Sequence, residues 1–150
     1  MKEITNVTII STNLNRNIIN NYNDYEVIDN NFKIEELVNK KKIIFFNILS
    51  NLDEKKLKKL FKYLYDNNVL FINITNNIEE ILYTERLIVY NENNIIIDGE
   101  TMEVLKNEKL LKRLGFNMPF IIELSNLLNN YNLVNKIYLD KESLVKDVWK

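Results

Sequence analysis

The sequence contains no cysteine and no histidine, and these two absences exclude several kinds of chemistry. Without cysteine the chain has no disulfide framework, no thiolate metal site and no cysteine nucleophile. Without histidine it lacks the usual general base and the commonest transition-metal ligand, so a Ser-His-Asp triad cannot be built. Any catalysis on this chain must therefore use carboxylates, lysine, tyrosine or backbone groups.

Other residue types are scarce or missing as well. The chain has 2 glycines and 1 proline, and it has no alanine and no glutamine, whereas 27 residues are asparagine. Asparagine shares A/T-rich codons with isoleucine, lysine, tyrosine and phenylalanine, which are also frequent. Genomic base composition therefore accounts for the excess, and an asparagine by itself carries no functional inference.

Charge and length favour one ordinary globular domain. The chain has 150 residues, 46% of them hydrophobic and 27% charged, which is enough to bury a core without disulfides or metals. With a net charge of −1 the chain lacks the excess of positive charge that is typical of nucleic-acid-binding proteins, so we expect no nucleic-acid partner. The lysines at 40–42 and 55–62 alternate with apolar positions, which is typical of the solvated face of a helix.

Long apolar runs are absent too. No segment approaches the roughly 18 apolar residues that cross a bilayer. The start, Met1-Lys2-Glu3, is polar and does not resemble a signal peptide. We therefore expect a cytoplasmic protein.

Short apolar runs predict an α/β fold with a short, mostly parallel sheet. Continuous runs such as Ile43–Phe46 are typical of strands buried on both faces. Between two such runs, Asp53 is placed to cap a helix whose apolar residues recur at i, i+3, i+4 and i+7. This strand–helix–strand order predicts a right-handed parallel crossover. The predicted strands are 7–10, 25–28, 43–46, 69–74, 87–90 and 95–97, and short helices are predicted near 14–19, 35–39 and 78–83.

The end of the chain is predicted to be helical. Asn91–Asn94 forms the turn of an antiparallel hairpin, and helices are predicted at 102–105, 108–114, 118–130 and 141–149. Gly115 is a natural helix C-cap, and Pro119 is expected in the first turn of its helix. Since no linker intervenes, we predict an α/β core over 1–100 and a helical tail over 101–150 within the same compact unit.

Two stretches resemble a known family. Ile43 to Gly99 is similar to the second half of an ABC transporter ATPase, with Ser50, Leu52 and Asp53 in the position of its D-loop. The run 110–120 and the following Glu123-Leu124 and Leu127-Leu128 resemble the C-terminal extension of ATPases in energy-coupling-factor (ECF) transporters. The resemblance implies a truncated P-loop NTPase-like fold. It also implies an interface through the tail, since the family's tail helices pack one ATPase subunit against another. The interface residues it implies are Pro119, Phe120, Leu124, Leu127 and Trp149.

The same resemblance aligns the family's nucleotide site with residues of other types. In the phosphate loop, Ser11, Leu14 and Arg16 stand at glycine positions, Asn13 matches the family asparagine, and Asn17 replaces the lysine. Phe46 stands at the Walker B aspartate, Asn47 at the catalytic glutamate and Asn76 at the switch histidine. About twenty residues stand where the family has its helical subdomain and signature motif.

These replacements remove the groups that bind Mg²⁺, activate water and meet phosphate charge. The sequence therefore favours a non-hydrolytic structural or regulatory subunit of an ECF-type vitamin or metal-ion transporter, with no cofactor and no metal. Its expected partner is a second copy or an intact ABC ATPase, with peripheral association at the membrane. Two alternatives stay open: an ATP-binding subunit with unorthodox motifs, and a free-standing interaction module.

Five further residues have ordinary structural interpretations. Asp53 is predicted to be a helix N-cap, and Arg86 to form a surface ion pair. Glu79, Glu80 and Glu85 are predicted to be exposed helix carboxylates, although such a patch could also bind a divalent ion weakly.

Overall fold

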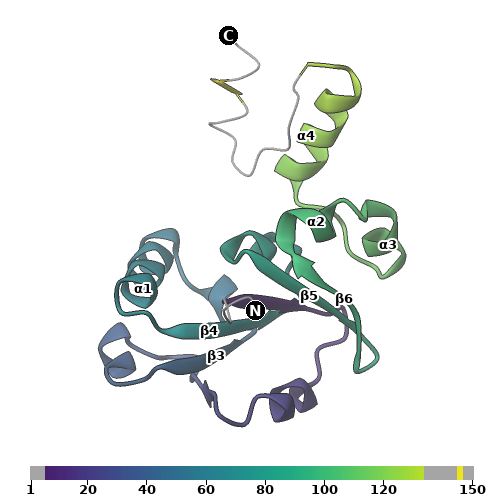
Figure 1. Ribbon diagram of the computed structural model, residues 1–150. Coiled ribbons are helices and arrows are strands. Elements are labelled where there is room, and N and C mark those ends of the chain that lie inside the picture. The colour runs from purple at the N-terminus through teal and green to yellow at the C-terminus, as the bar shows by residue number, and fades with distance from the viewer. Residues whose placement is uncertain (1–5, 134–144, 147–150) are drawn as a thin grey trace. The chain divides into compact units, whose positions relative to one another are not determined.

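The computed structural model describes residues 6–133 and 145–146 (Figure 1). The chain divides into two compact units, Met1–Asn107 and Glu108–Lys150. Each unit is described separately below.

The first unit is built on a six-stranded sheet, and each of its strands overlaps one of the six predicted ranges. The strands are β1 (Val7–Ile10), β2 (Glu26–Val27), β3 (Lys42–Phe46), β4 (Leu70–Thr75), β5 (Arg86–Asn91) and β6 (Asn94–Glu100), in the order β2-β3-β4-β1-β5-β6. Every neighbouring pair is parallel except β5 and β6, which form the terminal antiparallel hairpin. The α/β class and the mostly parallel sheet are therefore confirmed.

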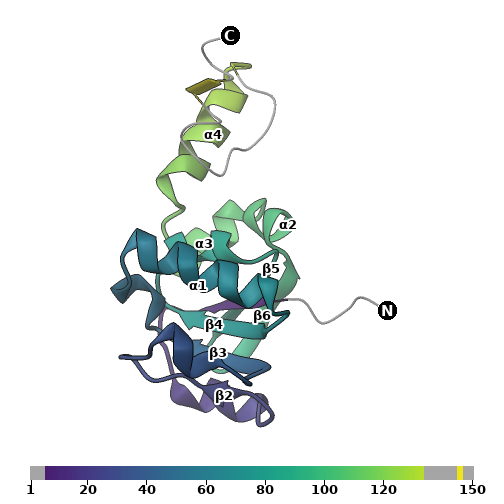
Figure 2. The same ribbon diagram turned by 90° about the vertical axis from the view of Figure 1, so that its left-hand side faces the viewer.

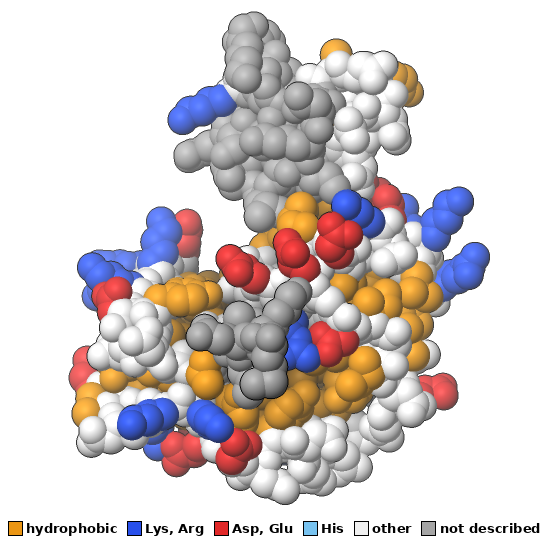
Figure 3. Space-filling view, in the orientation of Figure 1, with side chains coloured by type: hydrophobic (Ala, Val, Ile, Leu, Met, Phe, Trp, Pro, Cys, Tyr) orange, Lys and Arg blue, Asp and Glu red, His pale blue; other side chains and the backbone are white. Residues whose placement is uncertain are grey.

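One face of the sheet is covered by helix α1 (Glu54–Asp66), as Figure 2 shows. Leu60 and Leu64 of α1 are fully buried against a cluster that includes Phe45 and Phe71 from β3 and β4. α1 connects two parallel neighbours, β3 and β4, so a parallel crossover is confirmed. Its outer side carries the mostly exposed lysines of 55–62, as predicted, and blue side chains gather near α1 in Figure 3. The lysines of 40–42 do not lie on a helix as predicted, because they precede and begin β3.

The opposite face is covered by the segment after β1, which contains η1 (Arg16–Asn21). Ile18 is buried there with Ile9, Ile74 and Ile88. β3 contributes Phe45 to one face and Ile44 to the other, which explains its continuous apolar sequence. η1 is a 3₁₀ helix, as are the other short helical segments, η2 (Ile34–Leu37), η3 (Leu49–Asn51) and η4 (Ile78–Tyr83).

Asparagine makes many of the sharp backbone turns. Five of the six described non-glycine residues with positive φ are asparagines: Asn39, Asn47, Asn68, Asn93 and Asn132. The sixth, Glu92 (φ 50°), precedes Asn93 (φ 69°) in the two-residue turn between β5 and β6. Positive φ at both positions is the type I′ pattern, which matches the twist of a hairpin. In a chain with 2 glycines, asparagine supplies the left-handed residues.

Helix α2 (Thr101–Leu105) ends the first unit, and the second contains α3 (Glu108–Arg113) and α4 (Phe120–Asn130). Gly115, with φ 95°, follows α3 as predicted for a C-cap. Pro119 is the N-cap of α4 and not part of its first turn, since α4 begins at Phe120; its carbonyl accepts the N–H groups of Ile122 and Glu123 at 3.0 Å each.

The helix predicted over 141–149 lies outside the described residues except for Val145 and Lys146, which are helical. Among the helices of the described ranges, none combines the length and the apolar character needed to span a membrane.

Candidate functional site

The predicted nucleotide-site residues meet at one edge of the sheet. Ser11, Asn47 and Asn76 directly follow β1, β3 and β4, and these strands are parallel, so all three residues lie at their carboxyl ends. The N–H of Ser11 donates to the carbonyl of Thr75 at 3.2 Å, and the N–H of Asn47 donates to the carbonyl of Ile74 at 2.6 Å. Carboxyl edges of parallel sheets are common ligand sites, so this edge is the candidate site.

Arg16 and Phe46 contact each other at this edge. The guanidinium carbon of Arg16 lies 5.0 Å from the centre of the Phe46 ring, within cation–π range. The sequence resemblance predicts Phe46 at the position of the metal-binding aspartate and Arg16 at that of a phosphate-loop glycine. A phenyl ring has no lone pair for a metal, and the contact places a cation against it.

The loop after β1 uses its own amides internally. The N–H of Asn13 donates to Ser11 Oγ at 3.2 Å, and that of Asn17 to Asn15 Oδ1 at 2.9 Å. The N–H of Ile18 donates to the carbonyl of Asn15 at 3.1 Å. A phosphate loop instead directs such amides at the ligand. Together with Phe46, this hydrogen bonding does not fit Mg-ATP bound in the manner of the family motif.

Asn47 and Asn76 have no side-chain contact that suggests catalysis. Asn47 has φ 54°, a left-handed conformation that asparagine tolerates better than other non-glycine residues. The backbone therefore explains why asparagine stands there. Asn76 is exposed in the bend after β4.

The D-loop-like residues surround the start of α1. Ser50 is exposed in η3, and Leu52 is half-buried against the core under α1. Asp53 is the N-cap of α1, and its Oδ1 accepts the N–H of Lys56 at 2.7 Å. The N-cap interpretation of Asp53 is therefore confirmed.

We expect Asp53→Ala to lower the free energy of unfolding by about 1 kcal/mol, because the first turn of α1 loses its side-chain acceptor. Asp53→Asn, which keeps an acceptor oxygen, should lose much less. Urea unfolding of both variants checks this, and equal losses would show that the charge of Asp53 matters more than its cap.

Arg86 forms the predicted surface ion pair, and its partner is Asp98 on the neighbouring strand. Arg86 Nε and Nη2 donate to the two Asp98 oxygens at 2.9 and 2.6 Å. The guanidinium holds the pKa of Asp98 below its usual range, and the same hydrogen bonds raise the pKa of Arg86. The Arg86–Asp98 pair joins β5 to β6. Nearby, burial and the neighbouring Tyr90 raise the pKa of Tyr22 to about 12.

Glu80 differs from the prediction that Glu79, Glu80 and Glu85 are all exposed. Its side chain is buried, with 1% of the residue accessible, and it binds two polar residues of β4. The other two are exposed. Over the described ranges, no group of three or more acidic side chains could hold a metal ion.

The predicted interface residues are only partly exposed. Phe120 is 73% exposed and Leu127 51%, Leu124 is half-buried, and Pro119 is buried. A cavity of about 370 Å³ in the second unit is lined by Phe120, Leu124 and Leu127 together with polar residues that include Glu108 and Glu123. Trp149 lies outside the described residues.

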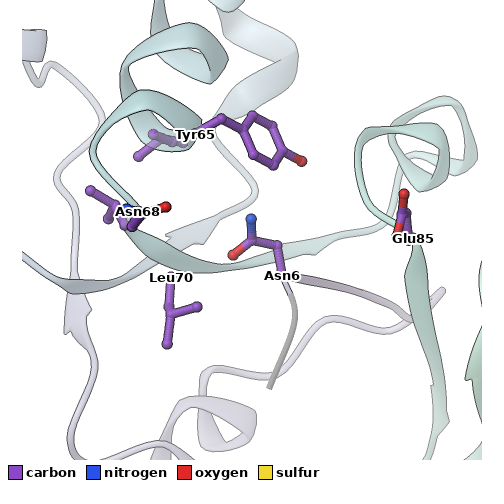
Figure 4. A pocket seen from close by; sticks show the side chains of 7 residues that line it. Asn6, Tyr65, Asn68, Leu70 and Glu85 are labelled. Atoms are coloured by element: carbon purple, nitrogen blue, oxygen red, sulfur yellow. The ribbon is translucent and has the colours of Figure 1, made fainter. Parts of the chain in front are cut away.

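A second cavity, of about 360 Å³, lies at the opposite, amino-terminal edge of the sheet (Figure 4). It is bordered by Asn6 before β1, Tyr65 of α1 and Glu85 before β5. Asn6 Oδ1 accepts the N–H of Phe71 at 3.0 Å. No residue of the predicted site lines this cavity.

The Arg16–Phe46 contact and the burial of Glu80 were not predicted from the sequence. Nothing in the sequence pairs residues 16 and 46. Glu80 did leave a signal, because Asn73 and Thr75 are polar residues in a buried strand. Buried polar groups need partners, and an acid five residues after Thr75 is within reach.

Comparison with known proteins finds similar sequences among transporter ATP-binding proteins. No family model matches the sequence. The chain is 31% identical over 112 residues to the energy-coupling factor transporter ATP-binding protein EcfA1 of Mycoplasma mobile. It has the same identity over the same length to EcfA of Malacoplasma penetrans. It is 35% identical over 79 residues to EcfA1 of Bacillus subtilis.

The chain is therefore similar to part of the ECF transporter ATP-binding proteins. The match to the Mycoplasma mobile protein covers 72% of this chain but 39% of that relative, so the chain spans about two fifths of its length. The names of these similar proteins agree with the family that the sequence resembles. Among solved structures, the chain is 20% identical to cbiO1 from Clostridium perfringens, part of the ABC transporter complex cbiONQ, with a TM-score of 0.38. That match covers 58% of this chain and 36% of cbiO1.

Proposed function

We propose that this chain is a non-hydrolytic, ABC ATPase-like subunit with a structural or regulatory role in an ECF-type transporter. The ECF relatives support the transporter association, because their names describe transporter ATP-binding proteins. The Arg16–Phe46 contact is the main observation in support of a loss of ATP hydrolysis. Arg16 lies over the Phe46 ring, and by the sequence resemblance Phe46 replaces the metal-binding carboxylate of the family.

Three further features support the same proposal. Neither Asn47 nor Asn76 can take a proton from water, and Asn17 carries no charge for phosphate. The loop amides of Asn13, Asn17 and Ile18 already have internal acceptors. Nucleotide binding would therefore have to break hydrogen bonds of the loop before it gained any to phosphate.

The tail supplies the proposed interface. Phe120, Leu124 and Leu127 recur at i, i+4 and i+7 on α4, so they form one apolar stripe, and two of the three are exposed by half or more. An exposed stripe of this kind is typical of a surface that binds another protein. The proposed partner is a second copy of the chain or an intact ATPase, at the membrane-facing assembly of a transporter.

A second candidate function is ATP binding through an unorthodox site, which the names of the relatives favour. The two candidates differ in one measurable property, the stabilisation of the folded chain by nucleotide.

We expect millimolar Mg-ATP to leave the melting temperature of the purified chain unchanged. A ligand at 100 times its Kd stabilises the folded state by about 2.7 kcal/mol. For a chain of this size, that corresponds to a rise of roughly 5–10 °C. Differential scanning fluorimetry measures the shift, with an intact ECF ATP-binding protein as positive control.

The same samples should release phosphate at the rate of buffer alone. A saturable rise of several degrees that Arg16→Ala abolishes would favour the unorthodox ATP-binding subunit. Turnover that disappears in Asn47→Ala would contradict the non-hydrolytic assignment itself.

A further inference from the structure

Glu80 is a buried acid that the proposed function does not use. It lies in η4, which packs beside β1, and 1% of the residue is accessible. Thr75 Oγ1 donates to Glu80 Oε2 at 2.5 Å, and Asn73 Nδ2 donates to Glu80 Oε1 at 3.1 Å. A carboxylate buried with two neutral donors and no cation is an unusual arrangement, because burial penalises the charged form.

The hydrogen bonds continue from Glu80 to the backbone of the candidate site. Thr75 Oγ1 also accepts the backbone N–H of Asn77 at 3.0 Å. Asn77 in turn caps η4, since its Oδ1 accepts the N–H of Glu79 at 3.0 Å. Thr75 thus joins the buried carboxylate to the two-residue loop that contains Asn76, at the carboxyl edge of the sheet.

The surroundings of Glu80 can also accommodate its neutral form. Asn73 Oδ1 is buried and has no hydrogen-bond partner. If the Asn73 amide turned over, that oxygen would face Glu80 and could accept the proton of a carboxylic acid. The site therefore offers two donors to the ionised acid and one unused acceptor to the protonated acid.

From these contacts we infer that Glu80 is a proton-controlled latch for the Asn76–Asn77 loop. The ionised carboxylate accepts a charge-assisted hydrogen bond from the Thr75 hydroxyl, which fixes the orientation of that hydroxyl. The Thr75 oxygen is then positioned to accept the Asn77 amide N–H. Protonation of Glu80 weakens the first bond, frees the Thr75 hydroxyl to rotate and loosens the loop. This regulation goes beyond the proposed function and does not depend on it.

The ionisable groups around the latch set the pH range in which it works. β1 and β4 carry none, and the nearby ones are Glu79 and Tyr83 on η4 and Tyr65 of α1, whose hydroxyl reaches the Tyr83 carbonyl. Burial raises the pKa of Glu80 above its ordinary value, although its two hydrogen bonds oppose the rise. The latch therefore opens at a higher pH than that at which an exposed glutamate would be protonated.

NMR titration of the full chain tests the inference. We expect the Glu80 carboxyl carbon to titrate above the ordinary range of a glutamate, and the Asn77 amide shift to follow the Glu80 midpoint. Below that midpoint, the protection of the Asn77 amide against exchange, taken relative to the intrinsic exchange rate at the same pH, should fall about tenfold, the equivalent of one lost hydrogen bond.

Four variants separate the latch from general acid effects. Glu80→Gln should abolish the pH response of Asn77, whereas the neighbouring exposed control, Glu79→Gln, should leave it unchanged. Thr75→Val should leave Glu80 titrating but uncouple Asn77, and Thr75→Ser should restore the coupling. If Glu80→Gln fails to fold, the two Thr75 variants still decide the question. An Asn77 amide that ignores the Glu80 titration, or that responds equally in Thr75→Val, would overturn the inference.

Discussion

Phe120→Asp is expected to abolish the self-association of this chain, or its association with an intact ATPase. Phe120 is 73% exposed at the start of α4 and leads the stripe that continues through Leu124 and Leu127. Burying an aspartate in that stripe would leave an unpaired charge, and interface aromatic residues commonly contribute 2 kcal/mol or more. We therefore expect association to weaken by more than about 30-fold.

Sedimentation at micromolar concentration measures this effect. Asn129→Asp is the matched control: it adds the same charge to α4 nine residues from Phe120, half a turn away from the stripe, and should not change the assembly. A chain that sediments as a single 18.0 kDa species, and that remains so with an intact ATPase added, would contradict the proposed interface.

Phe71→Ala should cause the largest loss of stability. Phe71 is 1% exposed in β4, and its ring contacts those of Phe45, Phe61 and Tyr65 at centroid distances of 6.0, 5.9 and 6.2 Å. Truncation leaves a cavity at the centre of this aromatic cluster, and such changes cost about 3–5 kcal/mol. That is a large part of the roughly 5–15 kcal/mol by which domains are stable.

Urea unfolding of the variant measures the loss. Val38→Ala also truncates an apolar side chain, at a position that is 56% exposed and outside the proposed interface, and it should alter stability by less than about 0.5 kcal/mol. Similar losses in both variants would mean that the cluster around Phe71 does not hold the first unit together.

The strands could be predicted because their apolar sequence is a direct consequence of burial. Ile43, Ile44 and Phe45 are apolar in succession because β3 is covered on both faces, and α1 has the spacing of a helix covered on one. The short helices were harder. The spacing of Ile18 and Ile19 does not distinguish an α-helix from the 3₁₀ helix that η1 forms, because only one or two turns exist.

The candidate site could be located from the sequence but not described. Residues that follow parallel strands must share an edge, so the meeting of Ser11, Asn47 and Asn76 was predictable. The contact of Arg16 with Phe46 was not, since it depends on how the loop after β1 folds over the sheet. The burial of Glu80 was not predicted either, because it depends on the packing of η4 beside β1; the polar residues of β4 were its signal in the sequence.

The left-handed asparagines limit how this sequence can change. A single base change in an asparagine codon can produce lysine, isoleucine, tyrosine or aspartate, and an A/T-rich genome favours the first three. Isoleucine is β-branched and is strained at positive φ, so Asn39, Asn68 and Asn93 have fewer tolerated replacements than asparagines in extended backbone. Mutational drift that enriched the chain in asparagine could thus remove glycine from its turns without unfolding them. The left-handed backbone at these asparagines in turn limits which residues can replace them.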